Sequence, residues 1–370
     1  MVPPARTVVA AAAFCAAVSS ACAHAPASSG PKSPLQRLTK EARRDLIRRA
    51  QVWAPTDIPA MDIKAGPQGK GAFPPGATVT CDKTDESGTG KSPKFYCKVP
   101  PDDEIKVKYG VSNGEVYAEV VASRLLWALG FGADRMYPVQ VVCRGCSADP
   151  FHDPRPAPSP VTFDPATIEQ KMPGKTLESK PDSGWKWPEL DLVDESAGGA
   201  PLAHRDALRL LAVLVKHTDS KAQQQRLTCL PGSADEARGT CDKPFMMVND
   251  LGVTFGKPII TNSNSKGSLN FENWSGTRIW KDPDQCVADL KKSFTGTLKN
   301  PRISEAGRKF LADLLVQLSD DQIRDLFEVA RVERRQPKPG QDWPQPAPVA
   351  RWVEEFKRKR AEIVNVTCPR

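Results

Sequence analysis

Cysteines constrain this fold more than any other feature of the sequence, because the chain begins as exported proteins do. Arg6 precedes TVVAAAAFCAAV, an apolar run of signal-peptide length, and small residues follow it. The run is too short to span a membrane. In an oxidising compartment an even number of cysteines predicts disulfides. Of the ten cysteines, Cys15 lies in the leader and Cys22 at its end, which leaves eight: Cys81, Cys97, Cys143, Cys146, Cys229, Cys241, Cys286 and Cys368.

Sequence neighbourhood suggests some of the pairs, although eight cysteines allow many connectivities. Cys81 with Cys97, and Cys229 with Cys241, would each close a short polar loop between two strands. The C-R-G-C segment at 143–146 follows a strand and precedes a Pro-rich loop. That setting favours a structural bridge over a redox dithiol. A zinc site is disfavoured, because histidines are few and there is no second C-x-x-C.

Two routes of leader processing are open. Ser20-Ala21-Cys22 resembles a bacterial lipobox, which would make Cys22 a lipidated first residue and attach the chain to a membrane. The A-x-A at 21–23 would instead allow ordinary cleavage, and we favour lipid attachment over it. We predict a signal peptide over 1–23 and a flexible tether, rich in Ala, Pro, Ser and Gly, over 24–38. The expected location is the periplasm or the outer membrane as a lipoprotein, or otherwise outside the cell.

The order of predicted elements indicates an α+β fold with two lobes. With 370 residues, of which 39% are hydrophobic, the chain can bury one or two cores. An amphipathic helix at 39–53 and short strands between 66 and 109 open the first lobe, a helix plus antiparallel sheet over 39–165. The second lobe, 166–370, is expected to be mainly helical. Its predicted elements are helices at 204–217, 303–318 and 348–364, with strands at 225–230 and 244–250.

The distribution of charged residues does not favour nucleic-acid binding. The net charge is +8, and the densest basic run, 357–360, lies on a predicted helix, where a solvated face accounts for it. No stretch interleaves aromatic and basic residues as nucleic-acid readers do. We therefore expect no nucleic-acid partner.

Two motifs in the second half carry the residue types of phosphoryl transfer. They are HTDSKAQQ at 217–224 and VNDLGVTFG at 248–256. Phosphoryl transfer needs a carboxylate near the attacking hydroxyl, a cation near the γ-phosphate and oxygen ligands for Mg²⁺. Asp219 would be the base and Lys221 the cation, while Gln224 and Asp250 would bind the metal.

The first half offers groups for a nucleotide. EIKVKYG places Lys106 and Lys108 on one face of a strand. The following helix offers Glu115 and Glu119, and we prefer a Lys108–Glu119 pair because Glu119 lies within the helix proper. Glu169 ends an apolar strand where a connection between lobes would bind adenine.

These motifs, in this order, resemble the protein-kinase pattern H-R-D-L-K-x-x-N and D-F-G. The resemblance covers residues 66–280 and is nearest to divergent members of the protein-kinase-like superfamily: the HipA-like, lipid-kinase-like and secretory-pathway kinases. The chain is also similar to exported bacterial proteins that carry K-V-K-Y-G and D-L-G-x-T-F-G.

The resemblance implies a two-lobed kinase-like fold that uses ATP and Mg²⁺ to transfer a phosphoryl group, or AMP, to a protein or small molecule. Gln224 stands where the pattern has Asn. Two alternatives stay open: an inactive pseudokinase or binding lipoprotein of the same fold, and a structural envelope protein in which the motif order is coincidence.

Overall fold

The computed structural model describes residues 35, 38–86, 90, 92–177, 184–256, 268–336 and 346–369. The predicted signal peptide, Cys22 and most of the tether lie outside these residues. Leu35, within the predicted tether, is buried, and Leu38 packs against the same core. Contacts group Ser33–Arg370 into one compact unit, so the division into lobes at residue 165 stays a prediction.

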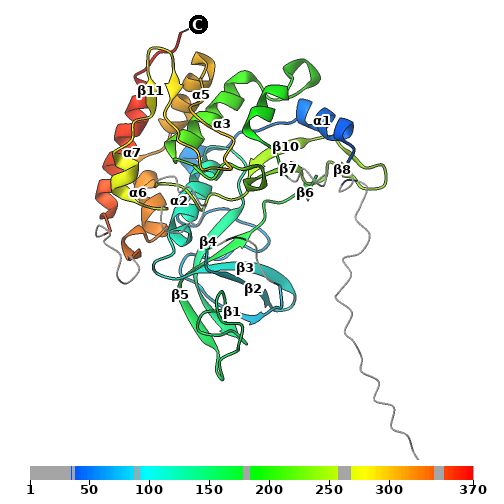
Figure 1. Ribbon diagram of the computed structural model, residues 1–370, viewed down its shortest axis with the longest axis vertical. Helices are drawn as coiled ribbons and strands as arrows, with labels where there is room; N and C mark the ends of the chain where they lie inside the picture. Colours follow the sequence, from blue (N-terminus) through cyan, green and yellow to red (C-terminus); the bar gives the residue numbers. More distant parts are fainter. Residues whose placement is uncertain are drawn as a thin grey trace, which may run out of the picture. The chain divides into compact units, whose positions relative to one another are not determined.

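Strands come in runs between the helices and the last α-helices follow one another, so the mixed helix and strand content agrees with the predicted α+β class (Figure 1). The α-helices are α1 (Lys40–Arg48), α2 (Glu115–Ala128), α3 (Leu202–Leu214), α4 (Phe271–Ser275), α5 (Glu305–Leu315), α6 (Asp320–Val329) and α7 (Val349–Val364). The longer strands are β1 (Thr78–Lys83), β2 (Lys94–Val99), β3 (Asp103–Tyr109), β4 (Arg135–Arg144), β5 (Val161–Gln170), β7 (Gln225–Cys229) and β10 (Pro244–Val248). The short strands are β6 (Lys175–Thr176), β8 (Ala234–Asp235), β9 (Thr240–Cys241), β11 (Trp280–Asp282) and β12 (Val287–Ala288). Short 3₁₀ helices cover Ile58–Ala60, Trp187–Leu192, Glu195–Ala197, Ala222–Gln224 and Val332–Arg334.

Strands β1 to β5 form a closed barrel in the order β1-β2-β3-β5-β4. The predicted sheet is antiparallel, whereas in the structure β1 pairs with β4 in parallel and this pairing closes the barrel. Alternate residues such as Phe95, Cys97, Ile105 and Val107 fill its interior. Closure leaves the five strands without an open edge, which sequence periodicity cannot reveal. Strand β5 runs across the predicted lobe boundary at residue 165.

Helix α2 connects β3 to β4 and is buried on nearly every side. A helix enclosed in this way lacks an exposed polar face, so its few charged residues lie inside the protein. Its polar members Glu115, Glu119 and Arg124 are all buried.

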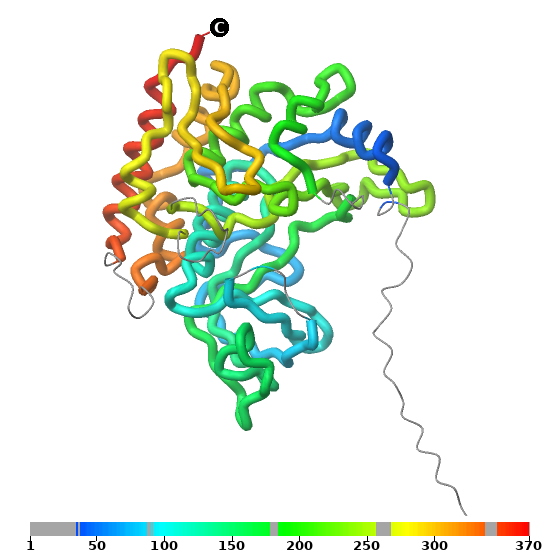
Figure 2. Tube along the Cα trace, viewed as in Figure 1, coloured from blue at the N-terminus to red at the C-terminus, as the bar shows by residue number. Residues whose placement is uncertain are grey.

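Helices α3, α5, α7, α6 and α2 pack in a chain of neighbouring pairs. Helix α3 lies on α5, and α7 packs against both α5 and α6, joined by Trp274, Phe327 and Trp352. The predicted capping box of Ser319 and Gln322 is confirmed at the start of α6. Helix α1, assigned by its position in the sequence to the strand-rich part, packs instead against β10 and the 187–192 turn, as the chain trace shows (Figure 2).

Four disulfides join the eight cysteines within the described residues. The predicted Cys81–Cys97 and Cys229–Cys241 pairs and the bridge within 143–146 are confirmed. The fourth joins Cys286 to Cys368. Such bridges indicate a location outside the reducing cytoplasm. Across the described ranges, none of the helices combines the length and apolar character that a bilayer crossing requires.

Candidate active site

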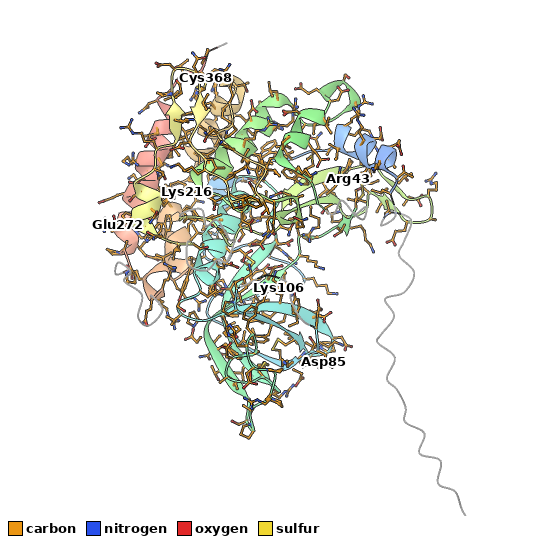
Figure 3. The ribbon with its side chains drawn as sticks, viewed as in Figure 1. Arg43, Asp85, Lys106, Lys216, Glu272 and Cys368 are labelled. Carbon is orange, nitrogen blue, oxygen red and sulfur yellow. A yellow bond between two sulfur atoms is a disulfide. The ribbon has the colours of Figure 1, made fainter. Side chains whose placement is uncertain are left out.

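Strand β3 presents two lysines on the face of the barrel opposite to its core. Because side chains alternate along a strand, Ile105 and Val107 point inward while Lys106 and Lys108 point outward. The register with β5 sets Lys106 beside Glu169 and Lys108 beside Thr167. Figure 3 labels Lys106 on this strand. Although it points away from the barrel core, Lys108 is only 1% exposed, because helix α2 covers this face.

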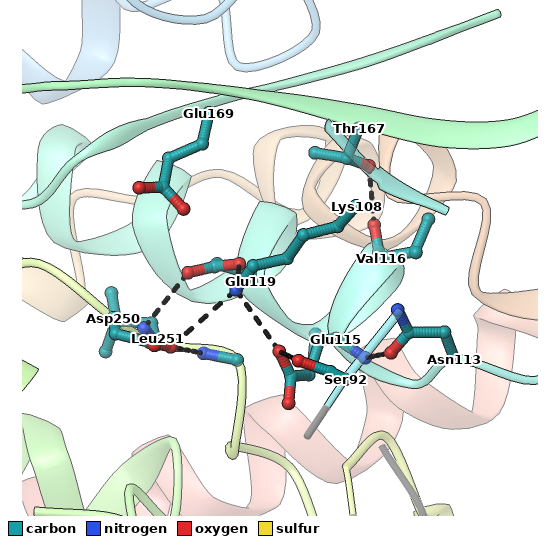
Figure 4. Close-up of polar contacts among 12 residues, drawn as sticks. Ser92, Lys108, Asn113, Glu115, Val116, Glu119, Thr167, Glu169, Asp250 and Leu251 are labelled. Carbon is teal, nitrogen blue, oxygen red and sulfur yellow. Dashed lines mark hydrogen bonds and ion pairs between the residues drawn. The ribbon is translucent and has the colours of Figure 1, made fainter. Parts of the chain in front are cut away.

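Three carboxylates surround the ammonium group of Lys108 (Figure 4). Its Nζ lies 2.5 Å from Glu119 Oε2 and 3.2 Å from Glu115 Oε2, both on α2. The third is Asp250 Oδ1, 3.8 Å away, on the segment that follows β10. The Ser92 hydroxyl, just before β2, donates to Glu115 Oε2 at 2.8 Å. Side chains from β3, α2 and the 249–252 segment therefore meet at one buried cation.

The groups around Lys108 differ in how readily they ionise. Burial alone would lower the pKa of Lys108, but Asp250, Glu119 and Glu115 outweigh it and hold the pKa well above its usual value. Burial raises the pKa of Glu119 to about 8, against the opposing effect of Lys108. Burial would also raise the pKa of Asp250, but Lys108 and Lys106 hold it well below its usual range. The structure therefore favours a charged Lys108 facing an ionised Asp250.

The chain around Asp250 is shaped to hold that carboxylate. The Gly252 amide donates to Asp250 Oδ1 at 3.0 Å, and the Leu251 amide donates to Glu119 Oε1 at 3.3 Å. A Cβ on Gly252 would lie 2.9 Å from the Glu115 side chain, so a larger residue there would displace the Glu115 carboxyl group. The Asp250 side chain is 26% exposed, unlike Lys108, and can therefore reach a ligand.

A second cluster follows α3 and contains the other predicted residues. Asp219 Oδ2 accepts from Gln224 Nε2 at 2.8 Å and lies 3.3 Å from Lys221 Nζ. Burial raises the pKa of Asp219, while Gln224 and Lys221 oppose the shift. The Gln224 carbonyl accepts from the amides of Asn249 and Asp250, at 2.9 and 3.3 Å. Gln224 thus joins the Asp219 loop to the Asp250 segment through its backbone.

His217, the first residue of the predicted motif, gives a prediction on pH. Burial lowers its pKa to about 4, so it is neutral in the folded protein at pH 7 and protonates more readily when unfolded. Its contribution to stability is therefore complete above about pH 6.5 and is lost as the pH falls through about 4. Denaturant unfolding across this window should show a decrease of about 1 kcal/mol per pH unit attributable to His217.

The matched variant for this prediction is His217→Gln, which cannot titrate. The difference in unfolding free energy between wild type and His217→Gln should change with pH only between about 6.5 and 4. Parallel profiles for wild type and His217→Gln would show that His217 is not buried as a neutral group.

Lys106 and Glu169 form an ion pair beside the Lys108 cluster. Two residues along β3 place Lys106 about 7 Å from Lys108. The pair lines a cavity of about 290 Å³ whose wall also contains Tyr96, Gln170 and Lys171. The structure thus brings these two predicted residues together, next to the Lys108 cluster and at the end of β5.

Three residues near Lys108 were not selected from the sequence. Glu115 was weighed and set aside in favour of Glu119, yet both contact Lys108. Lys94 lies opposite Lys108 in the β2–β3 register, and Ser92 binds Glu115. Alternation along KFYCKV could have indicated Lys94, since it shares a face with Tyr96. Nothing in the sequence indicates that Ser92 reaches α2.

The oxygen donors near Asp250 fit a hard cation such as Mg²⁺. Asp250 supplies an ionised carboxylate, and Gln224 supplies an amide oxygen when its nitrogen donates to Asp219. In the described ranges no group of three or more His, Cys, Asp or Glu side chains could hold a metal. Mg²⁺ takes few protein ligands and keeps waters and phosphate oxygens, so this small donor set suits it.

No family model and no curated protein matches this chain. Among solved structures, the chain is similar to the Helicobacter pylori proinflammatory kinase CtkA. The similarity covers 79% of this chain and 97% of that chain at 10% sequence identity, with a TM-score of 0.41. Similarity at this level is too low to assign a family or an activity.

Proposed function

We propose that this chain is a phosphotransferase with a two-lobed protein-kinase-like fold, which uses ATP and Mg²⁺ on a substrate outside the cytoplasm. The proposal rests chiefly on one observation. Lys108 and Glu119 lie on the consecutive elements β3 and α2, and Asp250, from a distant part of the chain, meets Lys108 at 3.8 Å. Asp219, Lys221 and Gln224 are joined to the same place through the Gln224 carbonyl. Phosphoryl transfer needs these residue types in this proximity.

Each predicted residue then has a role. Lys108, which is 1% exposed in this structure, would exchange one of its carboxylate contacts for the nucleotide phosphates, with Glu119 positioning it. Lys106 and Glu169 would contact the base. Asp250 and Gln224 would hold Mg²⁺, which neutralises charge on the phosphate oxygens. Lys221 would balance the charge of the transferred group.

Asp219 would receive the proton of the acceptor hydroxyl. The hydroxyl oxygen forms a bond to the γ-phosphorus as the bond from that phosphorus to the β,γ-bridging oxygen breaks. The electron pair of the broken bond leaves with ADP. Burial raises the pKa of Asp219, which makes its carboxylate a better proton acceptor.

One observation favours a second candidate, a catalytically inactive nucleotide or ligand binder of the cell envelope. Gln224 Nε2 and Lys221 Nζ both contact the Asp219 carboxylate. Both contacts oppose the rise in the pKa of Asp219 that burial causes, and both occupy Oδ2, which a substrate hydroxyl would otherwise approach. In both candidates Cys22 would attach the chain to a membrane if lipidated, and the chain would otherwise lie in the periplasm or outside the cell.

Nucleotide-dependent thermal stability tests the proposal, with Asp250→Ala as the central variant. Wild type with Mg²⁺ and ATP should melt several degrees higher than alone, since ligand at about 100 times Kd stabilises by about 2.7 kcal/mol. Asp250→Ala should lose most of this gain, and Asp284→Ala, at an exposed aspartate, should keep it. Repeating the measurement with ADP in place of ATP shows how much of the rise in melting temperature depends on the γ-phosphate. Repeating it with EDTA shows how much depends on the metal.

One result of this experiment would distinguish the phosphotransferase from the inactive binder, and another would refute nucleotide binding altogether. Binding by wild type without detectable ATP turnover or self-phosphorylation would favour the inactive binder. No stabilisation of wild type, or equal stabilisation of Asp250→Ala, would refute nucleotide binding at this site.

A further inference from the structure

A loop outside the predicted motifs lies directly against the Asp219 loop. The Ser293 amide donates to the Thr218 carbonyl at 2.9 Å. On the other side of Asp219, the Ser220 carbonyl accepts from the Thr297 amide at 3.0 Å and from its hydroxyl at 2.8 Å. The 293–298 segment therefore contacts both neighbours of Asp219, although it lies far from them in sequence.

This contact is close and specific rather than incidental. Ser220 Oγ accepts from the amides of Thr297 and Leu298, each at 3.1 Å. A Cβ on Gly296 would lie 2.9 Å from Ser220 Oγ and 3.2 Å from the Thr218 carbonyl oxygen, so a larger residue would require the two segments to shift apart. Ser293 and Gly296 are buried at the contact.

Phe294 projects outward from this fixed loop. Its side chain is 82% exposed, whereas the other exposed large hydrophobic residues in the described part of the chain lie between 37% and 55%. Phe294 follows Ser293, whose amide donates to the carbonyl of Thr218, and Asp219 follows Thr218. The backbones of Phe294 and Asp219 are therefore within about 11 Å of each other. The Phe294 ring therefore does not contribute to the hydrophobic core and is available for contact with another molecule.

The surface around Phe294 is positively charged. Lys291 and Lys292 precede it and are both exposed. Between residues 289 and 299 the sequence contains three lysines and a single acidic residue, Asp289. Lys221, beside Asp219, adds a further positive charge and is part exposed. An aromatic anchor flanked by cations is complementary to an apolar side chain flanked by carboxylates.

We propose that residues 291–294 form a docking surface for an acidic peptide segment of a protein, which presents a hydroxyl to Asp219. The role of this surface in catalysis rests on the proposed phosphotransferase function, but its capacity to bind such a peptide does not. Phe294 would pack against an apolar side chain of the peptide, and Lys291 and Lys292 would contact its Asp or Glu residues. The substrate class is thus a protein with an acidic acceptor segment.

Peptide binding in the absence of nucleotide tests this surface. The probe is a short fluorescent peptide with one Ser, flanking Glu residues and one Leu, measured by anisotropy at low salt. Phe294→Ala should weaken binding about tenfold or more, as expected for losing a buried aromatic contact. Lys291→Ala/Lys292→Ala should weaken it by about threefold to tenfold, and added salt should diminish that difference.

Matched controls exclude general effects of substitution. Val316→Ala removes another exposed apolar side chain, at the end of α5, and should not change binding. A peptide with Lys in place of Glu, and one with Gly in place of Leu, should bind more weakly than the probe. Since Phe294 is exposed, its replacement should leave the melting temperature unchanged.

Several outcomes would overturn the docking surface: no binding of the acidic peptide, equal binding of the basic one, or no effect of Phe294→Ala. Phe294-dependent binding to vesicles of anionic lipid without peptide binding would also overturn it, in favour of a membrane contact. Peptide binding as expected in a protein that does not bind nucleotide would leave the surface in place and refute only the phosphotransferase function.

Discussion

Replacing Lys108 with methionine should lower the free energy of unfolding by about 3–5 kcal/mol, the cost of removing one partner of a buried charge pair. Lys108 is 1% exposed and is the cation shared by Glu119, Glu115 and Asp250. Methionine keeps the length of the side chain but leaves these carboxylates facing one another in a region of low dielectric. Denaturant unfolding, monitored by tryptophan fluorescence, measures the loss.

A double variant separates charge from packing. Adding Asp250→Asn to Lys108→Met removes the ionised carboxylate that has lost its cation and should recover part of the lost stability. Lys98→Met, at an exposed position on β2, should change the unfolding free energy by less than about 0.5 kcal/mol. A Lys108→Met protein as stable as wild type would be incompatible with a charged Lys108 buried among carboxylates.

Removing the Cys286–Cys368 disulfide should have an effect of similar size. The two cysteines are 82 residues apart, so the bridge closes a long loop in the unfolded chain, and its loss costs about 4–5 kcal/mol by the loop-entropy relation. It also fixes the segment after α7, where the Cys368 amide donates to Glu305 of α5. Cys286→Ala/Cys368→Ala should therefore unfold at a markedly lower denaturant concentration.

The internal comparison is the bridge between Cys143 and Cys146, which are three residues apart. Its removal should cost only about 2 kcal/mol, because a short loop loses little entropy on closure. The ranking of the two double variants is the informative result. If the Cys143→Ala/Cys146→Ala protein were the less stable one, loop entropy would not govern how these disulfides stabilise the fold.

The spacing of residues close together in sequence predicted several features of the fold and of the candidate site. Alternation along EIKVKYG placed Lys106 and Lys108 on one face of a strand, and β3 has that arrangement. Helical spacing placed Glu119 on the next helix, and it contacts Lys108. Pairing by neighbourhood predicted the disulfides of short loops, and the capping box at Ser319 follows from a four-residue pattern. All of these depend on residues close together in sequence.

Features that depend on distant segments were missed or misassigned. Barrel closure pairs β1 with β4 across most of the strand-rich region, and helix α1 packs against β10 rather than near the barrel. Glu115 was set aside because it starts its helix, whereas the packing of α2 against β3 directs it to Lys108 as well. The 293–298 loop carries no motif, and only its hydrogen bonds to Thr218 and Ser220 connect it with Asp219.

By itself the sequence determined the residue types of the site, their order along the chain and the faces of the strands and helices that carry them. Spacings of two and of three to four residues encode those faces directly. The tertiary structure alone decided that Lys108 is shared by three carboxylates and that the 293–298 segment lies against both neighbours of Asp219. Such contacts depend on how whole elements pack, and many packings are compatible with the same local pattern.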